Sequence, residues 1–470
     1  MKEAVTVRIT RRHYDILHGH LFPGGYGEHG AIVLAGLAKI GQELRLTVRD
    51  VVLAKDGKEY VIGESGYHSL KATAISPLIK RCRDERLVYL AVHNHLSDDA
   101  VEFSDVDLNS HSEGYPALLD IARGMPVGAL VFGRRSVQAD LWLPDRSRRD
   151  LREMLVIGQS VHRLYPRQPR WSANTDKSHD RQVRMFGAKG QQILRRMRIA
   201  VVGLGGIGSL VTEYLARLGI GEFILVDEDV VETSNLSRLV GANQNDADNR
   251  ELKVDVAERH IREANAHARI TKLAMDAAAP KVVEELKSAD YIFLAADTMR
   301  ARLVINGLAQ QYFIPAVQLG AKVTASHSSR TLEDAISIVR PMRPGDGCLF
   351  CNGLIDSTAL ATELLKEEER RDIAYGVQEP NPSVITLNAV SAAHAVNDFL
   401  FDFLELRDKA EVEFLHLSHI RRRNSAVSPT HSPRCTECSC SLPHSRFARG
   451  DAVSAISMAA FSSEQDSHIR

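Results

Sequence analysis

The stretch Arg198–Leu210 reads RIAVVGLGGIGSL and decides the fold of the C-terminal half of the chain. Residues 199–202 are apolar, as in a buried strand, and residues 207–218 have the period of a helix. Between them stand four glycines, Gly203, Gly205, Gly206 and Gly208. A glycine turn lets phosphate oxygens approach the backbone, and the helix that follows presents free N–H groups. The sequence therefore predicts a nucleotide-binding turn.

The same alternation of strand and helix continues downstream. We expect strands at 223–226 and 291–294 and helices at 248–264 and 384–404. This order predicts a parallel, doubly wound, Rossmann-like sheet. Asp227 ends the strand after the glycine turn, 19 residues beyond Gly208, where a carboxylate binds ribose hydroxyls. On these features alone a dinucleotide dehydrogenase is the alternative.

Further motifs decide against a dehydrogenase. The string LVDEDVVETSNLSRL carries Asp227, Asp229, Asn235 and Arg238, and the string RQVRMFGAKGQQIL begins upstream at residue 181. Lys253 follows, and AADT at 295–298 contains Asp297. Across about residues 181–440, this ordered set resembles the adenylating domain of the ubiquitin-activating, ThiF and MoeB family.

The resemblance implies a role for each matched residue. The glycine turn holds ATP, Asp227 binds ribose, and Asp229 belongs to the same cofactor-binding set. Asn235, Arg238 and Lys253 grip the triphosphate, and Asp297 supports Mg²⁺. Arg181 reaches into the site from the partner subunit of a homodimer. Attack of a carboxylate on the α-phosphate needs its developing charge neutralised, which fits these residue types.

Five of the six cysteines form two short groups, as in metal sites. Cys348 and Cys351 form one C-x-x-C pair, Cys435 and Cys438 form another, and 83 residues separate the pairs. Two such pairs supply four thiolates for one structural Zn²⁺. ThiF-like proteins resemble this chain in that respect, and a redox role for one pair is the alternative.

One feature of conjugating family members is missing. They carry a cysteine in the loop before the segment that matches residues 375–380, and here that loop, KEEERRDIAYGV, contains none. Only Cys82 and Cys440 lie outside the two pairs. The resemblance therefore implies adenylation and leaves open whether a thioester forms on this chain.

The N-terminal part carries a second set of metal ligands. His93 and His95 flank one residue after an apolar run at 87–92, so a strand would place both imidazoles on one face. Asp107, twelve residues after His95, returns as a third ligand. Three protein ligands leave Zn²⁺ an open position, which is the catalytic arrangement. Glu28, in GEHGAIVLAG, is the candidate general base, with Glu64 as the runner-up.

Over about residues 10–140 this pattern resembles the JAB/JAMM zinc isopeptidases. The resemblance implies that His93, His95 and Asp107 bind zinc, that Glu28 is the general base and acid, and that Ser104 binds the developing oxyanion. Leu96 replaces the usual proline, and eight residues separate His95 from Ser104 where the common motif has seven.

Taken together, we expect a JAB-type α/β domain at 1–145, a linker at 146–180 that opens with a helix near 143–155, an adenylating domain at 181–445 and a disordered tail at 446–470. The net charge of −1 argues against nucleic-acid and membrane partners. The absence of an apolar N-terminal segment predicts a cytoplasmic protein.

The two activities address one object, a flexible protein tail that ends in glycine. We expect a ubiquitin-like modification pathway, with a conjugating enzyme as a further partner. The alternative is sulfur-carrier activation for cofactor or amino-acid biosynthesis, with a sulfurtransferase. A scaffold without turnover is the non-enzymatic alternative, and the intact motif set opposes it.

Overall fold

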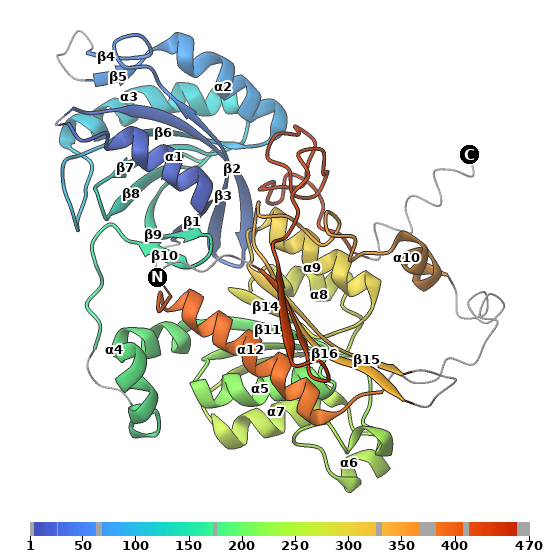
Figure 1. Ribbon diagram of the computed structural model, residues 1–470. Coiled ribbons are helices and arrows are strands. Elements are labelled where there is room, and N and C mark those ends of the chain that lie inside the picture. The colour runs from blue at the N-terminus through green and yellow to red at the C-terminus, as the bar shows by residue number, and fades with distance from the viewer. Residues whose placement is uncertain are drawn as a thin grey trace. The chain divides into compact units, whose positions relative to one another are not determined.

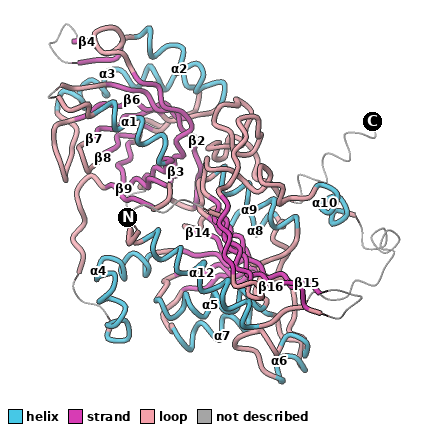
Figure 2. The backbone as a smooth tube through the Cα atoms, viewed as in Figure 1, coloured by secondary structure: helices cyan, strands magenta, loops and turns pink. Residues whose placement is uncertain are grey.

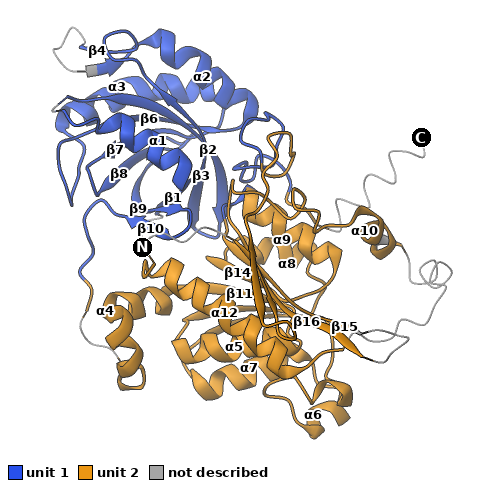
Figure 3. Cartoon of the chain, viewed as in Figure 1, with its two compact units in different colours: residues 1–170, 311–313, 439–454 blue, residues 171–310, 314–438, 455–470 orange. Residues whose placement is uncertain are grey.

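The computed structural model describes residues 4–25, 27–62, 68–172, 176–325, 331–365, 382–407 and 413–457. The chain folds into two compact units, coloured separately in Figure 3. Unit 1 comprises residues 1–170, 311–313 and 439–454, and unit 2 comprises residues 171–310, 314–438 and 455–470. Among the described residues, no helix combines the length and the apolar character that crossing a bilayer requires.

Unit 1 is built on a sheet that closes on itself, seen as magenta strands in Figure 2. Its strand order is β1-β3-β2-β6-β7-β8-β9-β10, and β1 also pairs with β9 in parallel. The elements are β1 (Val5–Thr10), α1 (Arg11–Leu21), β2 (Gly30–Ile40), β3 (Glu43–Leu53), β4 (Tyr60–Ile62), β5 (His68–Leu70), α2 (Ala72–Glu85), β6 (Val88–Asn94), α3 (Asp105–Ala122), β7 (Val127–Phe132), β8 (Val137–Trp142), β9 (Arg148–Ile157) and β10 (Val161–Leu164).

Two apolar clusters form the core of unit 1. One joins α1 to the strands through Tyr14, Leu17 and Leu21. The other joins α2 and α3 to the sheet and includes Cys82. The sheet thus lies between helices whose apolar faces need burial.

The helix that we expected near residues 143–155 is wrong. Residues 148–157 form strand β9, which pairs with β8 and, from Leu151 to Ile157, with β1. The charged residues of RSRRDLRE favour a helix locally, but β1 offers a backbone ladder and apolar neighbours for Leu151 and Met154. Tertiary contacts override weak local preferences in this way.

Unit 1 is completed by residues from the far end of the chain. The guanidinium of Arg49 is 1% exposed, and its Nη2 donates to the carbonyl oxygens of Leu442 (2.7 Å) and Pro443 (3.0 Å), while Nη1 donates to that of Phe447. Phe447 is 1% exposed and packs on Phe313 with ring centroids 5.0 Å apart. Residues 446–457 of the segment expected as a tail are described; residues 458–470 lie outside the described part.

Unit 2 contains the expected doubly wound sheet, with strand order β13-β12-β11-β14-β15-β16-β17-β18. The first five strands are parallel and the last three are antiparallel. The strands are β11 (Arg198–Val202), β12 (Glu222–Val226), β13 (Arg269–Leu273), β14 (Tyr291–Leu294), β15 (Ala316–Ala325), β16 (Leu332–Met342), β17 (Phe414–Ser418) and β18 (Arg423–Val427). The strands expected at 223–226 and 291–294 are confirmed.

Helices cover both faces of this sheet, with α5, α7 and α12 on one face and α8 and α9 on the other (Figure 1). The helices are α4 (Asp180–Arg196), α5 (Gly206–Leu218), α6 (Gln244–Asp248), α7 (Lys253–Ala264), α8 (Pro280–Leu286), α9 (Met299–Gln311), α10 (Ser357–Leu364) and α12 (Ile385–Phe403); the short 3₁₀ turns η1 (Lys177–His179) and η2 (Thr233–Asn235) precede α4 and α6. The helix expected at 248–264 is interrupted at Arg250, whose φ is +53°. The sheet reverses its order between β11 and β14, which is where doubly wound folds bind ligands.

We predict that Phe447→Ala destabilises unit 1 by about 3–5 kcal/mol, the usual cost of removing a buried phenylalanine. The reason is the loss of its contact with Phe313 and of the anchor for the carbonyls that Arg49 binds. Calorimetry of the full chain measures the effect. Ile16→Ala, on α1 at 44% exposure, is the control and should change stability little; equal effects would contradict this account.

We also predict that Cys82 resists alkylation in the native protein. The residue is 0% exposed, and burial raises the pKa of its thiol from 9.0 to about 12, so its thiolate fraction near pH 8 falls about 1000-fold. Mass spectrometry after iodoacetamide treatment should find Cys82 unmodified until the protein is denatured. Rapid labelling under native conditions would contradict this and reopen Cys82 as an acyl carrier.

Candidate functional site

The glycine turn of unit 2 is shaped by close backbone contacts. Gly203 has φ +87°, and a Cβ there would meet the amide nitrogen of Ala296 at 2.5 Å. A Cβ on Gly208 would meet the carbonyl oxygen of Gly203 at 1.8 Å. Helix α5 begins at Gly206 without a side-chain cap, so its first amides are available to an anion. The turn is therefore suited to phosphate.

Asp227 links the turn to the end of β12. Its Oδ2 accepts a hydrogen bond from the amide of Leu204 at 2.6 Å, and its Oδ1 accepts one from the amide of Asp229 at 2.9 Å. Burial raises its pKa, and the charge of Lys253 opposes that rise. Lys253 Nζ lies 2.6 Å from Asp229 Oδ2. The ribose-type carboxylate and the cation are thus side by side.

One cavity of about 940 Å³ gathers most of the nucleotide residues expected from the sequence. It is large enough for a nucleotide and part of a second substrate. The expected residues that line it are Gly203, Gly205, Gly206, Asp227, Asp229, Arg238, Lys253 and Asp297. They come from the ends of β11, β12 and β14, from the segment before α6 and from the start of α7, so the fold around the switch point of the sheet has brought them together.

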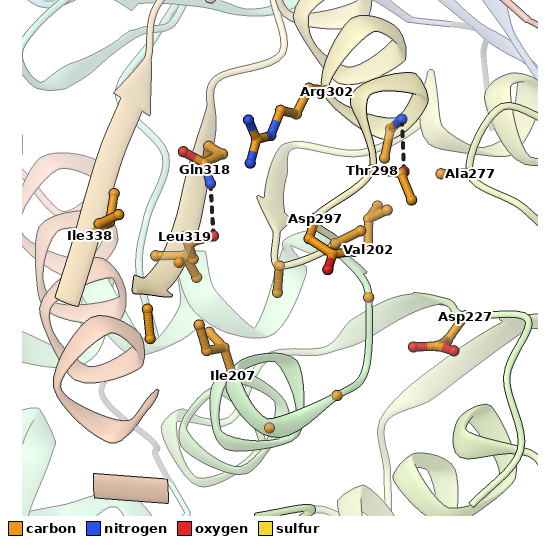
Figure 4. Close-up of a pocket in the computed structure, with 18 of the residues that line it drawn as sticks. Val202, Ile207, Asp227, Ala277, Asp297, Thr298, Arg302, Gln318, Leu319 and Ile338 are labelled. Carbon is orange, nitrogen blue, oxygen red and sulfur yellow. Dashed lines mark hydrogen bonds between the residues drawn. The ribbon is translucent and has the colours of Figure 1, made fainter. Parts of the chain in front are cut away.

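The sequence analysis missed the other half of this cavity. Arg302 on α9 and Gln318 on β15 line it, as does Arg340 on β16. In Figure 4, Arg302 and Asp227 lie on either side of Asp297. Arg302 lies five residues after Asp297, on the helix that follows β14, so its place near the site could have been predicted from the sequence. Arg340 could not have been predicted, because it reaches the cavity from the antiparallel strand β16.

Arg340 and Arg302 make this half of the cavity positive. Burial lowers the pKa of Arg340 to about 10, and the nearby charge of Arg302 acts in the same direction. Arg340 Nη1 donates to Gln318 Oε1 at 3.0 Å, and Arg302 Nη1 donates to the carbonyl oxygen of Leu354 at 3.1 Å. Within the described part of the chain, the Nε atoms of both arginines are buried without a hydrogen-bond partner. An anionic or carbonyl-rich group would be stabilised here.

Three expected residues do not line the cavity. Asn235 closes the turn η2 by accepting from the amide of Glu232 at 3.2 Å, and Gly208 packs α5 against the turn. Arg181 is exposed on α4. Their predicted roles in gripping phosphate, or in reaching a partner's site, stay predictions.

The four cysteines of the two C-x-x-C pairs converge. The Sγ atoms of Cys348 and Cys435 are 3.6 Å apart, those of Cys351 and Cys438 are 3.5 Å apart, and all four lie within 4.8 Å of one another. A tetrahedral zinc site with Zn–S bonds of about 2.3 Å has sulfurs about 3.7 Å apart. The four thiols therefore fit a closed zinc site. Cys440 lies outside the cluster.

His93, His95 and Asp107 form a second cluster, in unit 1. The Nε2 atoms of the two histidines are 3.3 Å apart, and each lies 3.5 Å from an oxygen of Asp107. Ligands at about 2.0–2.2 Å from a tetrahedral zinc would have these spacings. The extra residue between His95 and Ser104 therefore leaves Asp107 within reach of both imidazoles.

Ser104 positions the carboxylate of this cluster. It is the N-cap of α3, and its hydroxyl donates to Asp107 Oδ2 at 2.7 Å while its own amide donates to the same oxygen at 2.8 Å. The amide of Asp107 donates back to the hydroxyl at 3.2 Å. The capping box that starts the helix thus orients Asp107. The role of Ser104 toward an oxyanion stays a prediction.

His111 supports the same helix. Its Nδ1 lies 2.8 Å from Oδ2 of the buried Asp140, which also accepts from Trp142 Nε1 at 3.0 Å and from Arg148 Nε at 2.8 Å. His111 stacks on Tyr115, with centroids 4.5 Å apart. One turn separates it from Asp107, so this network fixes the face of α3 that carries the ligand.

Glu28 lies half-buried just before β2. The pKa of His95 is raised first by its hydrogen bond with Asp107, and the charge of Glu28 contributes to the same rise. The candidate base is therefore near the cluster. Glu64 and the loop 366–381 lie outside the described residues.

Comparison with known proteins places the region of unit 2 in a family. The chain is 35% identical to the sulfur carrier protein ThiS adenylyltransferase of Bacillus subtilis over 28% of this chain and 39% of that protein. It is 33% identical to the SAMP-activating enzyme E1 of Haloferax volcanii over 28% of this chain and 48% of that protein. It is 27% identical to the tRNA threonylcarbamoyladenosine dehydratase of Escherichia coli over 46% of this chain and 91% of that protein.

The chain thus spans less than half the length of the first two relatives. The sequence pattern of the ThiF family, by contrast, matches one continuous region, residues 179–437. That region contains the glycine turn, the cavity residues up to Asn388 and the cysteines of both pairs except Cys438, which follows it directly. It covers more than half of the chain, and the protein therefore belongs to the ThiF family.

Proposed function

We propose that unit 2 adenylates the C-terminal glycine of a ubiquitin-like or sulfur-carrier protein, and that unit 1 is a zinc peptidase of JAB/JAMM type acting on the same tail. The observation that carries the first part is the single cavity holding Gly203, Asp227, Lys253 and Asp297. It combines a phosphate-binding turn, a ribose-type carboxylate and cations at one end of a sheet.

The adenylation step forms a bond between a carboxylate oxygen and the α-phosphorus of ATP. The bond from that phosphorus to the bridging oxygen breaks, and pyrophosphate leaves. Arg238 and Lys253 neutralise the charge that develops on the phosphates, and the free amides of α5 orient them. Asp297 would hold Mg²⁺, which when bound shields the triphosphate. Arg302 and Arg340 occupy the opposite half of the cavity, where the incoming tail would enter.

The relatives support both candidate substrates. One has a name that states a sulfur carrier protein and another a name that states SAMP activation. A modification pathway is our first proposal. The sulfur-carrier alternative is favoured by one observation, the absence of a cysteine from residues 366–377, because transfer of the adenylate to an outside sulfur needs no thioester here.

The peptidase proposal rests on the cluster of His93, His95 and Asp107. Zinc held by three protein ligands acts as a Lewis acid and acidifies water at its open position. Glu28 would take the proton of the attacking water and give it to the leaving amine. Ser104 orients Asp107 and would stabilise the oxyanion as the carbonyl is attacked.

Two further parts complete the proposal. Cys348, Cys351, Cys435 and Cys438 would hold a structural zinc that ties the segment before residue 439 to the rest of unit 2. The exposed Arg181 would complete the ATP site of a second copy in a homodimer.

We predict that Asp297→Ala lowers ATP–pyrophosphate exchange, measured with a mature ubiquitin-like or sulfur-carrier partner, by about 100-fold or more. The reason is that removal of one group stabilising developing charge has a cost of this size. Asp248→Ala, exposed on α6 and outside the cavity, is the control and should exchange like the wild type. Exchange that no mature partner supports would refute the adenylation proposal.

We predict two zinc ions per chain, measured by inductively coupled plasma mass spectrometry, and one after His93→Ala with His95→Ala. Glu28→Gln should keep both ions and lose cleavage of a partner extended beyond its terminal glycine by about 10²–10⁴-fold, since only the proton transfer is lost.

His267→Ala, an exposed histidine of unit 2, is the control for the zinc count. An unchanged zinc count in the variant with both histidines replaced would contradict zinc binding by unit 1. Cleavage that survives Glu28→Gln would exclude Glu28 as the base.

A further inference from the structure

Asn94 stands between the two histidines of the unit 1 cluster and on the other face of β6. Successive side chains of a strand point to opposite faces, so Asn94 points away from the face that His93 and His95 share. The two histidine side chains are 13% and 24% exposed, whereas Asn94 is 0% exposed. A polar side chain buried to this degree needs hydrogen-bond partners.

The partners of Asn94 bracket Glu28. Asn94 Oδ1 accepts a hydrogen bond from the amide of His29 at 2.7 Å, and Asn94 Nδ2 donates to the carbonyl oxygen of Gly27 at 3.3 Å. These two residues lie immediately after and before Glu28 in the chain. One side chain therefore holds the backbone on both sides of the candidate base.

The two hydrogen bonds of Asn94, to the amide of His29 and to the carbonyl oxygen of Gly27, begin where the backbone pairing of β2 with β6 ends. Strands β2 and β6 are antiparallel, and their last pair is Gly30 with His93. A side-chain amide carries a donor and an acceptor, as a peptide group does. The side chain of Asn94 thus makes hydrogen bonds to the backbone just before β2, in the place where a neighbouring strand would otherwise make them.

The position of Glu28 relative to the cluster supports a functional reason for this bracket. The pKa of Tyr60 is raised by burial and, next, by the charge of Glu28 and then of Asp107. Tyr60 also packs against Gly30, where a Cβ would meet its ring at 2.5 Å. The charges of Glu28 and of Asp107 therefore act on the same tyrosine, which packs against the first residue of β2.

We propose that Asn94 is a positioning residue that holds Glu28 at the distance from the cluster at which it can transfer a proton. The inference rests on the proposed peptidase activity of unit 1. Fixing a catalytic group in advance removes the cost of ordering it during the reaction, and a displacement of about 1 Å can cost about 100-fold in rate.

Asparagine suits this position better than related residues. Aspartate keeps the acceptor for His29 and lacks the donor for Gly27. Serine is too short to span both partners, and alanine offers neither bond. We therefore expect the hydrogen bonding to residues 27–29 to weaken progressively in the order Asn94→Asp, Asn94→Ser and Asn94→Ala.

The first experiment measures the bracket itself, without metal or substrate. Hydrogen exchange of the full chain, followed by mass spectrometry of peptides covering residues 27–30, should be at least 10-fold faster in Asn94→Ala. Asn94→Asp should retain most of the protection at His29. Asn109→Ala, an exposed asparagine on α3, is the matched control and should exchange like the wild type. Unchanged exchange in Asn94→Ala would overturn the inference.

The second experiment separates positioning of the base from general folding. Asn94→Ala and Asn94→Asp should keep the wild-type zinc content, and their kcat for cleavage of an extended partner should fall by about 10–100-fold with KM within about twofold. Loss of zinc together with activity would mean that Asn94 holds the histidine strand instead, and would also overturn the inference.

The two proposals fail in different ways. If the wild type binds zinc and cleaves, but Asn94→Ala does so equally well, only the inference fails. If neither the wild type nor any variant cleaves, the peptidase proposal fails, and the exchange rates still decide whether Asn94 holds the segment around Glu28.

Discussion

The close approach of β11 and β14 is the constraint on which the rest of unit 2 depends. The two strands are adjacent and parallel, and the chain leaves β11 through Gly203, where any Cβ would collide with the backbone of Ala296. Only glycine permits the approach, with its positive φ. Because the order of strands reverses here, the helices α5 and α9 depart to opposite faces and a cavity opens between their starts. Gly203, Asp227 and Asp297 meet at that opening because each follows the carboxyl end of a parallel strand.

In unit 1, the side chains of Arg49 and Asn94 hold neighbouring backbone segments by hydrogen bonds, as paired strands do within a sheet. Arg49, fully buried, is anchored to the carbonyls of Leu442, Pro443 and Phe447, so a segment remote in sequence becomes part of the unit. Asn94 extends the sheet beyond its last backbone pair. In both cases polar atoms of a buried side chain bond to backbone atoms, and each of these atoms would cost about 1–3 kcal/mol if it were left unpaired. The capping box of Ser104 also has two effects: it starts α3, and it orients the side chain of Asp107.

The cluster of His93, His95 and Asp107 and the cluster of four cysteines differ in how far neighbouring residues in the sequence determine their geometry. In the unit 1 cluster, strand alternation places His93 and His95, and one capping box places Asp107. In the cysteine cluster, two pairs meet across 83 residues, and sulfurs of different pairs lie 3.5 and 3.6 Å apart although the sequence around each pair specifies only its own turn. The first cluster offers three candidate ligands and the second four, which are the ligand counts of catalytic and of structural zinc sites respectively.

The sequence by itself determined the doubly wound sheet, the glycine turn, the convergence of the two C-x-x-C pairs and the grouping of His93, His95 and Asp107 in unit 1. These depend on periods and spacings that are local, so residues such as Asp227 and Asp297 could be placed at strand ends in advance. Only the tertiary structure decided that residues 148–157 form a strand, that Arg302 and Arg340 make the second half of the cavity positive, and that residues 439–454 belong to unit 1. The reason is the same for each: they depend on partners that lie far away in sequence, such as β1 for β9 and Arg49 for Phe447, and no local period reports such a partner.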